Sequence, residues 1–128
     1  MNAGRIAIGY ENNGADPLII SVANGYFKKE LGRGVSLNLF SSGPAALSAL
    51  ASGALRFMCG LGLPPVIAAM AQGVPSQIIF NRERYTSGAG LVVKFNSRIT
   101  SVAALKGKSV AIVIGSQSSF GLAAFAAR

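Results

Sequence analysis

The sequence contains no histidine and only one cysteine, Cys59. Enzymes that work by nucleophilic or general acid–base catalysis rely heavily on these two residue types. Cys59 falls in an apolar stretch typical of a strand, where a small buried thiol is common, rather than at a helix N-terminus. A single cysteine forms no internal disulfide, so the chain does not reveal its redox compartment. We therefore expect no catalytic residue, no metal site and no cofactor.

The sequence also lacks a long hydrophobic run, although 51% of its residues are hydrophobic. The longest apolar stretch, residues 57–71, is interrupted by two glycines and two prolines, whereas a helix that spans a bilayer needs about 20 apolar residues. The first residues, MNAGRIAIGY, contain no hydrophobic signal segment, so either the protein is cytoplasmic or a leader has been removed. At 128 residues the chain is long enough for one ordinary domain and not obviously for two.

Acidic residues are scarce. The chain contains 4 Asp and Glu and 12 Lys and Arg, which gives a net charge of +8. This surplus favours anionic partners in general. The basic residues are scattered over most of the chain, and the sequence contains neither a basic helix or arm nor an aromatic-rich strand that could stack bases. We therefore expect no nucleic-acid binding, and a solvated basic surface is the simpler interpretation of the charge.

The middle of the chain contains the pattern around which the rest is organised. Residues 35–40, VSLNLF, alternate at the two-residue period of a strand. Ser42 then suits the N-cap of a helix, Pro44 its first turn and Gly53 its end. A second apolar strand follows at residues 54–60, so the pattern predicts a βαβ unit with parallel strands. The turn around Ser42 would lie at the carboxyl end of the first strand, where open α/β sheets bind anions.

Similar elements flank this unit. The sequence predicts a strand at 5–10, a polar turn at 11–15, a helix from Asp16-Pro17 to Gly32, a helix from Pro64-Pro65 to Gly73 and a strand at 77–80. The order β-α-β-α-β-α-β is the signature of a parallel sheet with helices on both faces, which is an α/β fold. The predicted core consists of Ile6, Ile8, Ile19, Val22, Leu37, Leu39, Leu47, Leu50, Phe57, Val66, Ile67, Ile78 and Ile79.

The pattern changes after residue 81. A polar stretch at 81–88 precedes a predicted strand at 89–94, a short helix at 101–105, a buried strand at 109–114 and a helix of small residues that stops at Arg128. The strand at 109–114 is apolar on both faces and has little chain after it to supply cover. We therefore expect a second α/β unit that has only begun, which is not stable by itself and could associate with another copy.

These residues, in this order, resemble the substrate-binding proteins of ABC importers for sulfonates, taurine, nitrate and thiamine-pyrimidine precursors. The resemblance covers essentially the whole chain and rests on a strand that ends in GY, the segment ANGYFKKELG, the FSSG turn, ALSALASGALRF with a G-x-G turn after it, GLVVK, and SVAALKGKSVAI followed by GS. It implies a periplasmic-binding-protein-like (type II) fold in which two α/β lobes close over a ligand. Lobe one would be residues 1–88, the crossing strand 89–94 and the incomplete second lobe 95–128.

The resemblance also implies a site at the turns that face the cleft between the lobes. Its residues would be Tyr10, Glu11, Asn12, Ser41, Ser42, Gly43, Leu61, Gly62, Leu63, Gly115, Ser116 and Gln117. Backbone N–H groups near Ser42, Gly43 and Ser116 would hold a small anionic or polar solute, such as a sulfonate, taurine or nitrate. Alternative interpretations remain, because Ser42 could be purely a helix cap, Gly62 only a turn glycine and Tyr10 an aromatic that caps the sheet.

The function implied by the resemblance is that of a solute-binding component, with an ABC permease in the membrane as partner and a periplasmic or other extracytoplasmic location. One departure is the sequence GLGL at residues 60–63, where sulfonate binders commonly have serines. The first alternative function is a ligand-sensing domain of the same fold. The second is an enzyme of the same superfamily that acts on sulfinates or thiamine pyrimidines, which the lack of histidine disfavours.

Overall fold

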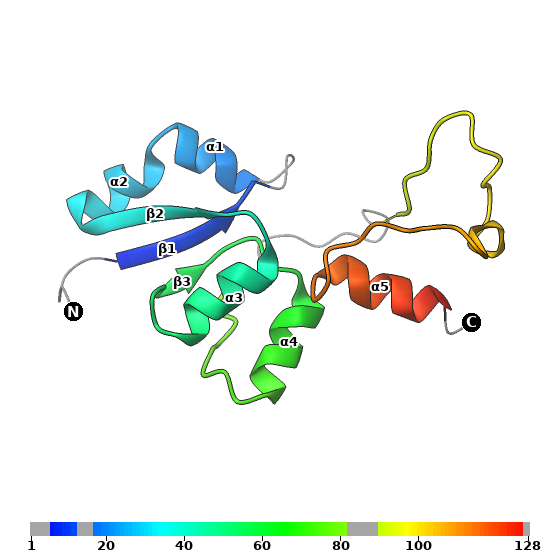
Figure 1. Ribbon diagram of the computed structural model, residues 1–128. Coiled ribbons are helices and arrows are strands. Elements are labelled where there is room, and N and C mark those ends of the chain that lie inside the picture. Colours follow the sequence, from blue (N-terminus) through cyan, green and yellow to red (C-terminus); the bar gives the residue numbers. More distant parts are fainter. Residues whose placement is uncertain (1–5, 13–16, 82–89, 127–128) are drawn as a thin grey trace.

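The computed structural model describes residues 6–12, 17–81 and 90–126 (Figure 1). In this part of the chain, β1 (Ile6–Glu11), β2 (Val35–Phe40) and β3 (Phe57–Met58) form a parallel sheet in the order β2-β1-β3. The central strand β1 pairs along its whole length with β2, from Ile6 opposite Val35 to Glu11 opposite Phe40, and more briefly with β3. Because the strands are parallel, their carboxyl ends meet at one edge. The predicted α/β fold with a parallel sheet is confirmed.

Helices cover both faces of this sheet. Those of the described residues are α1 (Pro17–Ala23), α2 (Tyr26–Leu31), α3 (Gly43–Ala51), α4 (Leu63–Ala71) and α5 (Gln117–Ala126), with 3-10 turns at Gly32–Gly34 and Ala103–Leu105. In Figure 1, α1 and α2 lie on one side of the sheet, α3 and α4 lie on the other, and α5 lies beside α4. The strand order explains this arrangement. β2 pairs on one side of β1 and β3 on the other, so the two connections run in opposite directions across the sheet. Because both crossovers are right-handed, their helices then lie on opposite faces. No helix in the described ranges has the length and apolar character needed to cross a bilayer.

The single helix predicted between Asp16 and Gly32 is divided into α1 and α2. Gly25 has a left-handed backbone, with φ of 67°, and its N–H donates to the carbonyl of Val22 over 3.1 Å. The side chain of Asn24 donates to the carbonyl of Ile20 over 2.9 Å, at the end of α1. The prediction of one continuous helix is therefore wrong, because a left-handed glycine ends the first helix and redirects the chain into the second.

The core is centred on the middle of β1. Its buried apolar residues are Ile8, Leu18, Val35, Ala46 and Leu55. Gly9 follows Ile8, and a β-carbon built on it would lie 2.5 Å from Cδ1 of Leu55 and 2.7 Å from the sulfur of Met58. Since no β-carbon could be so close, the lack of a side chain at Gly9 allows Leu55 and Met58 to pack directly on the backbone of β1.

Several residues predicted for the core lie at the surface instead. Leu39 is 58% exposed, Phe57 43%, Ile67 54%, Ile78 49% and Ile79 71%. The others, apart from Ile8, are half-buried: Ile6, Ile19, Val22, Leu37, Leu47, Leu50 and Val66. The exposure of Phe57, Ile78 and Ile79 has a common cause. β3 has only two residues, and no further strand lies beside it in the described part of the chain, so the sheet is too narrow to bury every apolar face.

The strands predicted after α4 are not formed. Residues 77–80 and 109–114 have no strand structure, and neither do residues 90–94 of the predicted strand 89–94, whose first residue lies outside the described ranges. Their apolar side chains remain in solvent: Val92 is 97% exposed and Ile114 83%. A strand needs a neighbour to accept and donate its backbone hydrogen bonds, and these segments pair with no other described segment. Of the helix predicted at 101–105, only the 3-10 turn Ala103–Leu105 is present.

We predict that Ile8→Ala lowers the free energy of unfolding by about 2–5 kcal/mol, because it empties a site at the centre of the core. Ile8 is 4% exposed, whereas Ile20 on α1 is 61% exposed. The matched control Ile20→Ala should therefore change stability by no more than about 0.5 kcal/mol. Urea unfolding followed by circular dichroism measures both. Equal losses for the two variants would contradict this description of the core.

Candidate functional site

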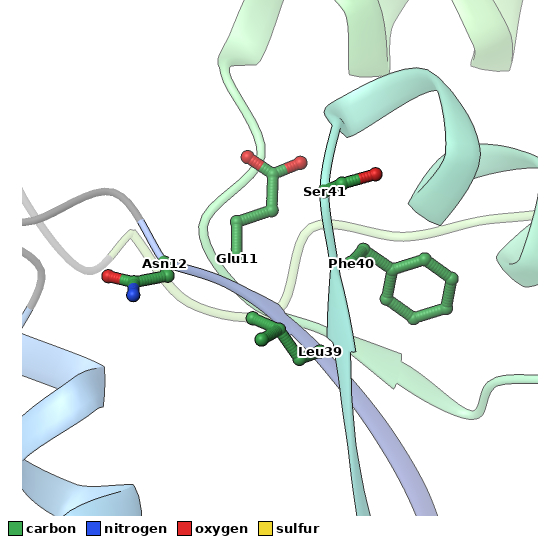
Figure 2. Close-up of a pocket in the computed structure, with 5 residues that line it drawn as sticks. All are labelled: Glu11, Asn12, Leu39, Phe40 and Ser41. Atoms are coloured by element: carbon green, nitrogen blue, oxygen red, sulfur yellow. The ribbon is translucent and has the colours of Figure 1, made fainter.

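A pocket of about 350 Å³ opens where β1 and β2 end. It is lined by Glu11 and Asn12 at the end of β1 and by Leu39, Phe40 and Ser41 at the end of β2 (Figure 2). The chain leaves β1 toward the side of α1 and leaves β2 toward the side of α3, so the two connections separate at this edge. Such a divergence creates the crevice at which open α/β sheets bind ligands. The volume is at the small end of the range for ligand pockets, which begins at about 300 Å³.

Glu11, the last residue of β1, lies beside the start of α3. In Figure 2 its carboxylate points toward the turn that opens α3. A β-carbon built on Gly43, the first residue of α3, would lie 3.3 Å from Oε1 of Glu11 and 3.5 Å from Cδ2 of Leu61. The Oε1 atom is buried although the residue as a whole is only half-buried. Gly43 therefore lies close to two other predicted site residues, Glu11 at the end of β1 and Leu61 after β3.

The side chain of the N-cap residue leaves the first backbone donors of α3 uncapped. Ser42 has the extended backbone of an N-cap, with φ of −160° and ψ of 150°, but its hydroxyl makes no capping hydrogen bond. The first backbone bond of the helix runs from the N–H of Ala46 to the carbonyl of Ser42 over 3.2 Å. The N–H groups of Gly43 and Ala45 precede it and so have no acceptor within the helix. Ser42 therefore holds the N-cap position that the sequence predicted, although its hydroxyl makes no capping hydrogen bond.

The start of α4 offers fewer donors than the start of α3. Its N-cap is Gly62, and the helix begins Leu63-Pro64-Pro65. Since proline has no N–H, only Leu63 among these three residues has a backbone donor. Of these two helix starts, that of α3 therefore offers more backbone donors to an anion.

The segment before α5 packs against both of these helix starts. A β-carbon on Gly115 would lie 3.3 Å from Cγ of Pro44, and one on Gly62 would lie 2.7 Å from both Cβ and Oε1 of Gln117. Gly62 is thus more than a turn glycine, because it allows Gln117 to approach the start of α4. The helix starts of α3, α4 and α5 consequently lie together at one edge of the sheet.

Ser116 is engaged within its own turn. Its hydroxyl donates to the carbonyl of Val113 over 2.6 Å, and its backbone N–H donates to the same oxygen over 3.1 Å. The neighbouring N–H of Gly115 donates to Oγ of Ser119 over 3.1 Å. The expectation that the backbone N–H of Ser116 points to a ligand therefore does not fit this turn.

Two other predicted site residues, Tyr10 and Leu63, do not line the pocket. Tyr10 is half-buried on β1, and Leu63 is 55% exposed. Ser41 does line the pocket, although its hydroxyl points away from Glu11 in Figure 2. Leu39 and Phe40 also line it, which the sequence interpretation missed. The available signal was their position as the last residues of β2, immediately before the Ser41 turn.

The charge of this pocket is opposite to that of the whole chain. Glu11 is the only charged residue among the described residues that line it, and Lys and Arg are absent from that lining. The chain as a whole carries +8. The residues that the structure describes contain no group of three or more Cys, Asp or Glu side chains that could hold a metal ion. Recognition at this edge would therefore depend on backbone amides and one carboxylate.

Comparison with known proteins identifies two relatives. A protein of Bacillus subtilis (strain 168) named for binding aliphatic sulfonates is 34% identical over 114 residues, which are 87% of this chain and 34% of that protein. The taurine-binding periplasmic protein of Escherichia coli (strain K12) is 30% identical over 122 residues, which are 95% of this chain and 37% of that protein. The chain is a relative of these two binding proteins. The resemblance found in the sequence motifs is thereby confirmed.

The similarity covers only part of the two relatives. The chain spans about a third of the length of the two relatives. No family model and no solved structure matches the chain. Both relatives are named as binding proteins and neither as an enzyme, which agrees with the lack of histidine in this sequence.

We predict that Gly62→Ala moves the start of α5 away from α4, because the new methyl group would meet the β-carbon of Gln117, which no side-chain rotation can move aside. In ¹H–¹⁵N spectra the amides of residues 115–120 should shift. Gly90→Ala is the matched control, since a β-carbon on Gly90 has no neighbour within 4 Å among the described residues. The second change Gln117→Gly should restore the original shifts in the Gly62→Ala background. Unchanged spectra for Gly62→Ala would contradict the close contact.

Proposed function

We propose that this chain contributes a ligand-binding lobe to the solute-binding component of an ABC importer, and that the solute carries a sulfonate group. The observation that carries the proposal is the pocket at the carboxyl ends of β1 and β2, beside the start of α3, where the Ser42 side chain makes no capping hydrogen bond. The similarity to proteins named for aliphatic sulfonates and for taurine supports the same solute class.

The start of α3 suits a sulfonate for a physical reason. The N–H groups of Gly43 and Ala45 are unused within the helix, and the positive end of the helix dipole lies at the same place. A sulfonate has three acceptor oxygens and one negative charge, so it can accept both hydrogen bonds. The net charge of +8 would attract an anion to the protein from a distance.

The proposal extends to the wider organisation of the protein. Residues 1–88 would form lobe one, residues 89–94 would cross between lobes, and residues 95–128 would begin the second lobe. The packing of Gly115 and Gln117 against the starts of α3 and α4 supports the idea that a second lobe approaches lobe one here. The partner would be an ABC permease, and the location would be extracytoplasmic, as the name of the Escherichia coli relative says of that protein.

We predict that this chain binds ethanesulfonate and taurine weakly, with Kd in the millimolar range, and prefers both to nitrate. Chemical shifts of ¹⁵N-labelled chain during titration measure this, and the amides of residues 41–46 should respond most. A protein that carries this chain together with a complete second lobe should bind more tightly, since each additional 1.4 kcal/mol of contact is worth about tenfold in affinity.

Substitution at the N-cap tests where the sulfonate is bound. Ser42→Leu places a bulky apolar side chain beside the donors of α3 and should weaken sulfonate binding at least about tenfold, because it removes about 1.4 kcal/mol or more of contact. Ser48→Leu is the matched control, since Ser48 is exposed on the same helix, away from its start. Equal affinities of Ser42→Leu and the original chain would exclude this location, and failure of both sulfonates to bind the original chain would exclude the proposed function.

We also predict self-association through the uncovered apolar segments after residue 89. Phe95 is 105% exposed and Ile114 83%. Since buried apolar surface contributes about 25 cal/mol per Å², a second copy could stabilise these segments by covering them. Sedimentation velocity over a range of concentrations should show oligomers, and the double variant Phe95→Ser/Ile114→Ser should shift the distribution toward monomer. A monomer at every concentration, with strong amide protection throughout residues 95–126, would contradict this.

A further inference from the structure

We propose that Asn24 is a site of spontaneous deamidation, and that this modification opens the joint between α1 and α2. The inference is independent of the proposed function. It rests on the pair Asn24-Gly25, which forms the joint, and on how weakly the two helices beside the joint are held.

The joint requires these two residue types. Gly25 has φ of 67° and ψ of 21°, a left-handed backbone that residues with a side chain rarely adopt. The side-chain Nδ2 of Asn24 donates to the carbonyl of Ile20 over 2.9 Å, and the backbone N–H of Asn24 donates to the same oxygen, also over 2.9 Å. The features that turn the chain here therefore also create an Asn-Gly pair.

An Asn-Gly pair can react without help from any other protein group, and asparagine is among the labile residues of proteins. The backbone nitrogen of Gly25 loses its proton and attacks Cγ of Asn24. The new N–C bond closes a five-membered succinimide ring, the bond from Cγ to Nδ2 breaks, and Nδ2 leaves as ammonia. Water then opens the ring at one of its two carbonyls, which gives an aspartate or isoaspartate residue in place of Asn24. The step needs no oxidant or reductant.

The attacking nitrogen is unobstructed by a side chain. Gly25 has no β-carbon, and the place where one would lie has no neighbour within 4 Å among the described residues. Glycine therefore allows the ring to close where a residue with a side chain would hinder it.

Two hydrogen bonds must break before the ring can form. The N–H of Gly25 donates to the carbonyl of Val22 over 3.1 Å, and Nδ2 of Asn24 donates to Ile20. Asn24 is exposed, so water can replace its bond and the net cost is small. The helices add little resistance, since α1 has 7 residues with only Leu18 buried and α2 has 6 residues with none. Local opening of the joint therefore exposes the pair to the reaction.

The product cannot remake the joint. A carboxylate has no donor for the carbonyl of Ile20, and its negative charge would lie at the negative end of the α1 dipole. Isoaspartate has a larger effect, because the main chain then runs through the β-carbon and gains a methylene group just before Gly25. Deamidation should therefore release α2 from α1.

The experiment incubates the folded chain in mildly alkaline buffer, where the attacking nitrogen loses its proton more readily, and follows the tryptic peptide of residues 6–28 by mass spectrometry. Fragment ions separate Asn24 from Asn13, which also precedes a glycine but lies outside the described residues. Asn96 is the control in the same sample, because it is also exposed but precedes Ser97. Asn24 should convert at least about tenfold faster than Asn96, which corresponds to about 1.4 kcal/mol of activation free energy.

A second measurement tests whether the modification opens the joint. In ¹H–¹⁵N spectra the amides of residues 20–31 should shift as Asn24 converts, whereas those of α3 should not. Asn24→Asp should reproduce part of this shift without incubation. Asn24→Gln keeps an amide but would have to close a six-membered ring, so its spectrum should stay constant during the incubation.

Three results would overturn the proposal. The first is an intact Asn24 in the folded chain after a time in which the chain unfolded in urea converts, because the joint would then protect this residue. The second is conversion of Asn24 and Asn96 at equal rates. The third is conversion of Asn24 that leaves the amides of residues 20–31 unshifted, because the modification would then leave the joint closed.

Discussion

The parallel pairing of β1 with a strand on each side is the constraint on which the rest of the structure depends. It brings the carboxyl ends of three strands to one edge, and the turns after them then meet there. The backbone holds this pairing through bonds such as that from the N–H of Arg56 to the carbonyl of Ala7, 2.9 Å long. Gly9 is equally necessary, since Leu55 and Met58 occupy the space that its side chain would fill. A site residue at this edge therefore depends on packing in the middle of β1.

A helix or strand could be predicted from the sequence where the residues that determine it lie within the element or next to it. The strands β1 and β2, the helix after Ser42 and the stop near Gly53 follow from periodicity and from capping residues, which act within a few residues. The strands predicted at 77–80 and 109–114 had the same local signals, but a strand also needs a partner, which a sequence pattern does not supply. The exposure of Leu39 and Phe57 has the same origin. Alternation shows that one face is apolar, not that another element covers it.

In the candidate site, too, some features could be predicted from local signals and others could not. The positions of the turns followed from the βαβ pattern, so the meeting of Glu11, Gly43 and Leu61 could be anticipated as a meeting of three turns. The direction of individual side chains could not. Ser41 points away from Glu11, and both donors of Ser116 bond to the carbonyl of Val113 within the same turn. A residue pattern gives neither the rotamer nor the turn geometry on which these directions depend. The break at Gly25 is different, since Asn-Gly is a recognised turn signal that the helical periodicity around it obscured.

The glycines at this edge explain how polar groups from separate segments come so close. A side chain at Gly43 would press against Oε1 of Glu11, and one at Gly62 would collide with Gln117. Each glycine therefore removes bulk where one element must approach another, so the carboxylate after β1 can lie beside the first turn of α3. An edge built in this way offers backbone donors and one buried negative charge at short separation.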